Sequence, residues 1–169
     1  EPLQELLPLL DALNIDIKAL DDDFYRRLCG ARLEPVLETC RQAKKTSHVE
    51  ITNLVIPGEN DQPAQLARLV DWVAAELGPD TPLHFSAYHP DYRMARPPTP
   101  EAILLRAREL ARAKLHYVFI GNVRIEEGAD TLCPFCGELL IQRSGYVVKV
   151  PGLAGGKCRR CQAKIPVRG

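Results

Sequence analysis

Apolar and polar residues recur along the first 120 positions with two alternating periods. The apolar spacing is helical over residues 3–10, 33–40, 66–77 and 103–111, and it fits strands over 13–18, 49–56, 83–88 and 117–120. In the first of these strands, Asn14, Asp16 and Lys18 fall on one face. Strands that alternate with helices of this length predict an α/β fold, in which a parallel sheet carries its helices on the outside.

Capping and turn residues set the expected ends of these elements. The acidic run 21–23 predicts the cap of a short helix that Gly30 ends, and Pro63 opens the helix after the second strand. Thr99 followed by Pro100 predicts the start of the last helix, with Thr99 as its cap. Four strands are too few to close a barrel, so we expect a missing N-terminal half or a partner chain to cover the exposed sheet edge.

Two C-x-x-C turns near the C-terminus carry the most specific chemical signal. They are Cys133 to Cys136 and Cys158 to Cys161, with 21 residues between them. Two such turns, joined by a hairpin with strands over 138–142 and 146–150 and a turn at 143–145, predict a zinc ribbon with four thiolate ligands. Few apolar residues are available there, so the metal would replace a core. Rubredoxin-like iron, an auxiliary iron–sulfur cluster and two disulfides are the alternatives.

Composition narrows the class of protein. The 169 residues divide into a predicted α/β domain, residues 1–128, and the ribbon, residues 129–169. Lysine and arginine number 22 against 22 aspartates and glutamates, which argues against bulk binding of nucleic acid or of anionic membranes. With no apolar run of about 20 residues, a cytoplasmic protein is predicted. The remaining cysteines, Cys29 and Cys40, are expected to be ordinary buried thiols.

Polar loops follow the predicted strands at their carboxyl ends. These ends carry Asp16 and Lys18, the loop 57–61, the stretch 88–91 and residues 121–122. In parallel α/β folds ligands bind at this edge of the sheet. The sequence therefore predicts a binding site there, whereas His48, His84 and His116 are expected to be structural or exposed.

Five motifs occur in the order in which one enzyme family carries them. They are Asn14 to Lys18, Tyr25 to Thr39, Ile56 to Asp61, His89 to Tyr92 and Tyr117 to Val123. With the four-cysteine ribbon behind them, the chain resembles the radical SAM enzyme of the AmmeMemoRadiSam system, a relative of the pyruvate formate-lyase activating enzymes. The resemblance covers essentially all 169 residues and implies the C-terminal half of a partial (β/α)6 barrel.

The resemblance also implies cofactors. Enzymes of this class hold a [4Fe-4S] cluster on a C-x3-C-x2-C loop, which these 169 residues do not contain. The chain thus resembles the portion that lacks the cluster-binding N-terminal part, and we expect it to be inactive alone. Carried over from activating enzymes, Asp16, Lys18 and His89 would help to hold S-adenosylmethionine, with Lys18 and His89 near its methionyl carboxylate. Otherwise Lys18 is a solvated strand end and His89 a turn residue.

Two functions from different classes follow. For the complete protein the resemblance implies cleavage of S-adenosylmethionine to a 5′-deoxyadenosyl radical, with AMMECR-like and Memo-like proteins as partners. Thr52 and Asn53 stand where activating enzymes of glycyl radical enzymes tend to carry an arginine, which argues against a glycyl-radical substrate. The alternative is a zinc-ribbon module that binds a protein or a nucleic acid. Its basic residues would be Arg159, Arg160, Lys164 and Arg168.

Overall fold

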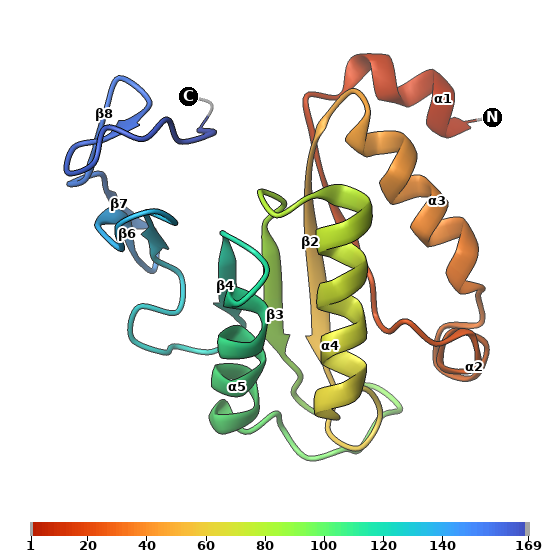
Figure 1. Cartoon of the computed structure of the whole chain (residues 1–169). Coiled ribbons are helices and arrows are strands. Elements are labelled where there is room, and N and C mark those ends of the chain that lie inside the picture. The colour runs from red at the N-terminus through yellow and green to blue at the C-terminus, as the bar shows by residue number, and fades with distance from the viewer. Residues whose placement is uncertain (1, 168–169) are drawn as a thin grey trace.

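A parallel sheet of four strands forms the centre of the structure. The computed structural model describes residues 2–167. The strands lie side by side in chain order, each parallel to the next (Figure 1). They are β1 (Ala12–Asp16), β2 (His48–Val55), β3 (Leu83–Ala87) and β4 (Val118–Gly121). The predicted α/β class with parallel strands is confirmed.

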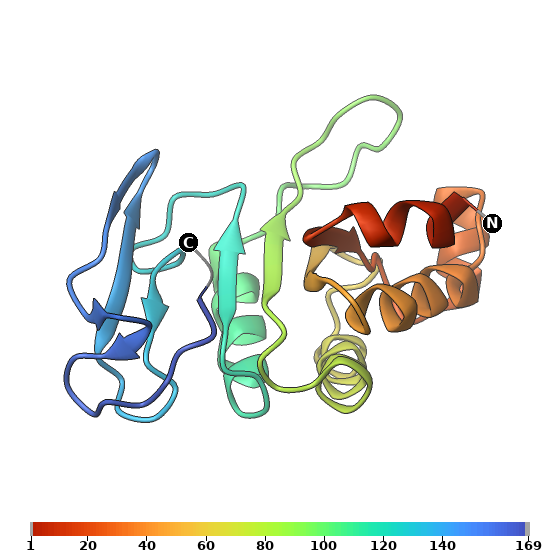
Figure 2. The same cartoon turned by 90° about the horizontal axis from the view of Figure 1, so that it is seen from above.

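The connections between the strands are helical. They are α2 (Asp22–Phe24), continued by the π-helical turn η2 (Tyr25–Cys29), α3 (Leu33–Lys44), α4 (Pro63–Trp72), continued by η3 (Val73–Leu77), and α5 (Glu101–Arg112). A short helix α1 (Pro2–Leu6) and a 3₁₀ turn η1 (Leu7–Leu9) precede β1 and lie beside α3 (Figure 2). Helix α3 packs on β2, α5 packs on β3 and β4, and α4 packs against α5. The long helices therefore cover one face of the sheet.

The two faces of the sheet differ in chemistry. Along β2 the buried side chains alternate with half-buried ones, and the buried set faces the helices. On the other face β2 carries His48, Glu50 and Thr52, and β3 carries His84 and Ser86. Parallel sheets are ordinarily apolar and covered on both faces. Among the described residues no helix covers this polar face, which thus resembles the inner wall of an incomplete barrel.

Most predicted helix ends are confirmed. Asp21 caps α2, because its carboxylate accepts hydrogen bonds from the backbone N–H groups of Asp23 (2.8 Å) and Phe24 (3.1 Å). Gly30 ends η2 in the left-handed region, at φ 60°. Pro63 opens α4, where Gln62 and Gln65 bond each other's backbone as a capping box.

Thr99 does not cap α5, contrary to the prediction. Pro100 is the N-cap residue, and no side chain bonds there. The Thr99 hydroxyl instead donates to the carbonyl of Val55 (2.6 Å) and accepts from the N–H of Tyr88 (2.7 Å). The Val55 carbonyl lies at the end of β2 and the Tyr88 N–H directly after β3, where both have lost their ladder partners. These two groups therefore bond the Thr99 hydroxyl in preference to the first turn of α5. Thr99 thus ties the end of β2 to the end of β3.

The prediction of two buried thiols holds for one of them. Cys40 lies on the buried face of α3 and is fully buried in the core. Cys29 is exposed, because it is the last residue of η2 and is followed directly by the left-handed Gly30. Its position at the helix end turns it away from the core.

The C-terminal ribbon consists of short antiparallel strands beside β4 (Figures 1 and 2). They are β5 (Thr131–Leu132), β6 (Leu139–Ser144), β7 (Val147–Lys149), β8 (Leu153–Ala154) and β9 (Lys157–Cys158). The predicted hairpin is present, but its turn lies two residues later, at Gly145 and Tyr146, with Gly145 at φ 58°. Leu140 and Ile165 are the only buried apolar residues apart from cysteine in the ribbon's described core cluster. The boundary at residue 128 stays a prediction.

Two buried asparagines join the ends of β1 and β2. The carbonyl of Lys18 accepts hydrogen bonds from the side-chain amides of Asn53 (3.0 Å) and Asn60 (2.6 Å). Asn60 also donates to the carbonyl of Leu54 (2.9 Å) and accepts from the N–H of Ile56 (2.6 Å). Asn60 itself is 2% exposed, and its bonds satisfy three backbone groups at the ends of β1 and β2.

We predict that Asn60→Ala lowers the free energy of unfolding by about 2–4 kcal/mol, because it leaves buried backbone groups without partners. Asn14→Ala is the control, since Asn14 makes only an exposed bond with Thr52 (2.9 Å), and its loss should cost about 0.5 kcal/mol or less. Urea unfolding followed by the fluorescence of the single tryptophan, Trp72 in α4, measures both. Equal midpoints for the two variants would contradict the role given to Asn60.

Candidate functional site

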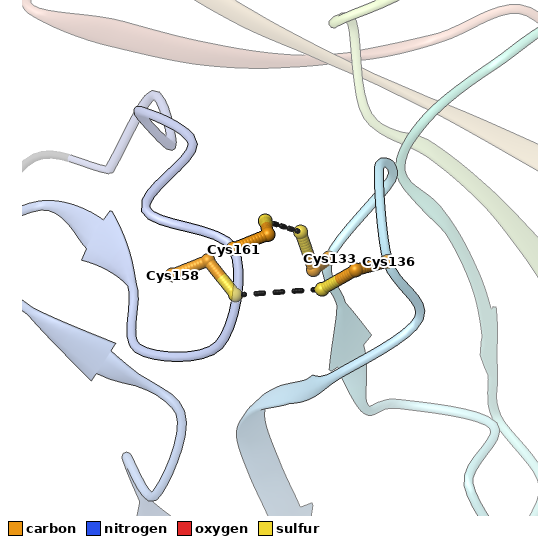
Figure 3. Close-up of side chains that lie close together, drawn as sticks. All are labelled: Cys133, Cys136, Cys158 and Cys161. Carbon is orange, nitrogen blue, oxygen red and sulfur yellow. Dashed lines mark hydrogen bonds between the residues drawn. The ribbon is translucent and has the colours of Figure 1, made fainter.

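Four cysteines converge between the two turns of the ribbon (Figure 3). The Sγ atoms of Cys133 and Cys161 lie 3.6 Å apart, as do those of Cys136 and Cys158, and all four lie within 4.8 Å of one another. A tetrahedral centre with metal–sulfur bonds of about 2.3 Å has sulfur–sulfur edges of about 3.8 Å. The separation exceeds the ~2.05 Å of a disulfide. The four cysteines therefore could bind a metal ion.

Local backbone geometry gives the two turns the same shape. The N–H of Gly137 donates to the carbonyl of Cys133 (2.9 Å), and the N–H of Gln162 donates to the carbonyl of Cys158 (2.9 Å). Gly137 and Gln162 both have positive φ, 73° and 61°, which closes each turn directly after its second cysteine. The backbone N–H of Cys161, and with it that of Arg160, lowers the pKa of Cys158 to about 7. A low thiol pKa favours the thiolate, which is the metal-binding form.

A second cluster lies on the polar face of the sheet. The Glu50 carboxylate bonds Nε2 of His84 (2.8 Å) and Nε2 of His48 (3.2 Å). The His84 ring stacks on Phe119 of β4, with ring centroids 5.0 Å apart. The hydrogen bond from His84 lowers the pKa of Glu50 to about 2, against the effect of burial and with help from His48. This cluster was missed from the sequence, although the alternation His48, Glu50, Thr52 puts three polar side chains on one strand face.

Two of the predicted cofactor residues are brought together at the end of β1. The Nζ of Lys18 lies 2.6 Å from a carboxylate oxygen of Asp16, and the Lys18 side chain is 31% exposed. The strand ends at Asp16, two residues earlier than predicted, because the backbone groups of Lys18 bond side chains instead of the backbone of β2. The N–H of Lys18 donates to the buried hydroxyl of Tyr25 (3.0 Å), which fixes the backbone of Lys18 in place.

His89 is placed at the same edge but not in contact with this pair. It is exposed and follows β3 by two residues, and β2 lies between β3 and β1. Within residues 2–167 no hydrogen bond or ion pair joins His89 to Asp16 or Lys18. Their shared role stays a prediction.

A buried carboxylate organises the loops at this edge. The Glu59 side chain is 6% exposed and accepts from Arg27 (2.7 Å) and Arg96 (2.5 Å). Arg27, then Arg96, holds the pKa of Glu59 below its usual value. Arg27 follows β1, Glu59 follows β2 and Arg96 follows β3. Glu59 therefore joins three of the loops at the carboxyl ends of the strands, which we call the rim. The sequence pattern indicated only a polar turn at 57–61.

Comparison of the sequence with known proteins gives a relative but no family. No known family profile matches the chain. An uncharacterized protein of Methanocaldococcus jannaschii is 48% identical over 172 residues, which cover 99% of this chain and 51% of that protein. The chain thus spans about half the length of the curated relative it matches.

No helix in residues 2–167 combines the length and the apolar character that crossing a membrane requires.

Two solved structures share the fold. One is a domain of a pyruvate-formate lyase-activating enzyme from Bacteroides vulgatus, with a TM-score of 0.61 and 19% identity over 71% of this chain and 73% of that one. The other is a radical SAM methyltransferase from Sphaerobacter thermophilus, with a TM-score of 0.51 and 21% identity over 79% of this chain and 42% of that one. The chain therefore has an α/β fold like part of the radical SAM barrel, followed by a four-cysteine cluster.

We predict that Glu50 makes stability depend on pH in the acid range. In the folded chain Glu50 stays ionised down to pH about 2, whereas its ordinary pKa is 4.5. Between these values the unfolded chain binds more protons, so the contribution is present above pH 4.5 and is lost as the pH falls toward 2. With a carboxylate that is 36% exposed, solvent screening limits the contribution to about 1 kcal/mol.

Glu50→Gln removes this contribution, so the difference in unfolding free energy between wild type and variant should shrink from pH 6 to pH 2.5. Urea unfolding followed by Trp72 fluorescence reports on the α/β part alone, whatever happens to the ribbon thiols in acid. A difference that stays constant over this range would mean that Glu50 is not held ionised by its histidines.

Proposed function

We propose that this chain is the S-adenosylmethionine-binding part of a radical SAM enzyme related to the pyruvate formate-lyase activating enzymes. The observation that carries the proposal is the parallel sheet with helices on one face and polar residues on the other, in a fold similar to a domain of such an enzyme. A sheet face of this kind suits a polar ligand inside a barrel better than it suits a packed core. The narrower assignment to the AmmeMemoRadiSam group belongs to this proposal.

The residues at the end of β1 fit such a ligand. Lys18 offers an ammonium group that is held at the sheet edge and only partly solvated, and a carboxylate ligand would accept charge-assisted hydrogen bonds from it. Asp16 would orient that ammonium, and His89 would add a second donor to the same carboxylate. With a reduced [4Fe-4S] cluster, S-adenosylmethionine supplies a 5′-deoxyadenosyl radical in enzymes of this class. The part of this chain is to bind and orient the cofactor before reaction.

The rim is suited to that task because its loops are held from several sides. Glu59 joins the loops after β1, β2 and β3, and Asn60 holds the backbone next to Lys18. A binding group that is fixed before the ligand arrives loses little freedom on binding. We propose further that an upstream half of the protein or a partner chain covers the open face and edge, and that AMMECR-like and Memo-like proteins are its partners.

For the four cysteines we propose zinc in a structural role. Four thiolates without an open position form a closed site that zinc occupies in ribbons. The ribbon's described core cluster contains two of the cysteines themselves, together with Leu140 and Ile165, so little else holds it together. The metal would therefore supply much of the folding free energy of the ribbon.

We predict one zinc per chain, which is lost when Cys158 is replaced by Ser. The ribbon should then unfold, while the unfolding midpoint reported by Trp72 in the α/β part stays unchanged, because the two parts have separate cores. Cys29→Ser is the matched control, since Cys29 is exposed and lies outside the cluster. Elemental analysis of reduced, chelator-free protein measures the metal. Less than about half an equivalent of zinc in the wild type would overturn the assignment.

We predict that Lys18→Ala weakens the binding of S-adenosylmethionine to the cluster-loaded full-length protein by about 1.5–3 kcal/mol, the scale of a hydrogen bond to a charged group. Stability should barely change, since Lys18 contributes its backbone rather than its side chain to the fold. His89→Ala should lower turnover more than binding, if it aligns the cofactor. Calorimetric titration measures the affinity, and Lys45→Ala, at the exposed end of α3, is the control.

Wild-type affinity in Lys18→Ala would show that Lys18 is only a solvated strand end. The transfer of roles from the activating enzymes would then fail, whereas equal losses in Lys18→Ala and Lys45→Ala would indicate a general effect of charge.

A further inference from the structure

The last strand of the ribbon's hairpin has one open side. In the sheet order β5-β6-β7, strand β7 pairs with β6 alone. Apart from that ladder, no backbone hydrogen bond joins residues 146–150 to any other segment of residues 2–167. Unpaired N–H and C=O groups along a strand are a template for another extended chain. Strand β7 is thus an available edge.

Four of the five side chains at positions 146–150 are apolar, although water surrounds them. Tyr146 is fully exposed, and Val147, Val148 and Val150 are 59%, 56% and 49% exposed. These residues point to both faces of the hairpin, so neither face contributes them to the ribbon's core. A contiguous apolar run on an exposed strand edge is a feature of surfaces that bind another molecule. The hairpin's own stability does not account for it.

The turn geometry identifies which backbone groups face outward. Gly145 has positive φ and Tyr146 does not, so the two-residue turn is of the II′ type, which makes Ser144 and Val147 a hydrogen-bonded pair. Hydrogen-bonded and non-hydrogen-bonded pairs alternate along an antiparallel ladder. The N–H and C=O of Val148 therefore point away from β6. Proline at this position removes an outward donor without breaking a bond to β6.

The charge of the ribbon selects the kind of partner. Residues 129–169 contain seven lysines and arginines against two acidic residues, whereas residues 1–128 contain fifteen against twenty. The formal charges are thus +5 and −5, and a divalent ion held by four thiolates leaves the ribbon at +3. Of the ribbon's basic side chains in residues 129–167, only Arg160 has an acidic partner, Glu138 at 3.7 Å. Two ribbons paired edge to edge would repel, whereas acidic side chains would be attracted.

We propose that β7 is the docking edge for an extended segment of a partner protein that carries alternating apolar and acidic residues. The segment adds to the ribbon as a fourth strand. Its backbone bonds the outward groups of Val148, its apolar side chains cover Val148 and Val150 on one face, and its carboxylates lie near Lys149 on the other face. Such strand addition takes its affinity from main-chain bonds and its specificity from alternate side chains. This interaction is separate from cofactor binding at the rim, which lies on the α/β part.

The test uses the zinc-loaded chain and a capped seven-residue peptide of alternating glutamate and valine. Titration followed by amide chemical shifts, at low ionic strength, should perturb residues 144–150 and slow hydrogen exchange at Val148. Val148→Pro should weaken binding at least tenfold, whereas Val148→Thr, which keeps the N–H, should stay within about threefold. Lys149→Glu and high salt should each weaken binding several-fold. An unchanged zinc content shows that each variant retains its ribbon.

Other outcomes would overturn the proposal. Among them are equal affinity of Val148→Pro and wild type, equal binding of the peptide with lysine in place of glutamate, and no perturbation of residues 144–150 at millimolar peptide. Binding of a single-stranded oligonucleotide at Tyr146 without binding of the peptide would assign the surface to nucleic acid instead. Protection of the Val148 amide in the full-length protein alone would show that its own upstream part occupies the edge.

Discussion

The carbonyl of Lys18 accepts hydrogen bonds from two buried side-chain amides, and the candidate binding edge of the sheet depends on this arrangement. Asn53 and Asn60 donate the two bonds from the end of β2 and from the loop after it. The backbone of Lys18 has left the strand ladder, so without these amides its carbonyl would have no protein partner. Asn53 and Asn60 thus hold the backbone of Lys18 so that its side chain lies at the end of β1, beside Asp16. Lys18 thus combines a backbone carbonyl that is held by the fold with a side chain that is a candidate ligand contact.

Local patterns were sufficient to predict the main helices and strands of residues 1–128, because each depends on residues close in sequence. The cap at Asp21, the left-handed stop at Gly30 and the proline start at Pro63 are determined within a few positions. The four-cysteine cluster was predictable for the same reason, since two C-x-x-C turns carry their own geometry. Thr99 was assigned wrongly because its hydroxyl bonds strand ends 11 and 44 positions away, which compete with its own helix.

The groups that sequence reasoning missed are linked across strands. Glu50 and His84 are 34 positions apart, and Glu59 and Arg96 are 37 apart. Polar pairs at such separations carry no periodic signal. The pairing of β2 with β3 brings Glu50 and His84 together, and the loops after these strands bring Glu59 and Arg96 together. What covers the polar face of the sheet also could not be predicted from the sequence. A strand that alternates polar and β-branched residues predicts one wet face, but not whether water, a ligand or the rest of a barrel lies against it.

The central proposal is that a full-length protein containing this fold carries out radical chemistry on S-adenosylmethionine. The most direct test is the formation of 5′-deoxyadenosine after anaerobic reconstitution and reduction, with the full-length protein and the 169-residue chain side by side. The account predicts 5′-deoxyadenosine from the full-length protein and none from the chain alone, which has no C-x3-C-x2-C spacing. A cluster-loaded full-length protein that leaves S-adenosylmethionine intact would contradict the claim, as would a 169-residue chain that binds about four irons and cleaves it.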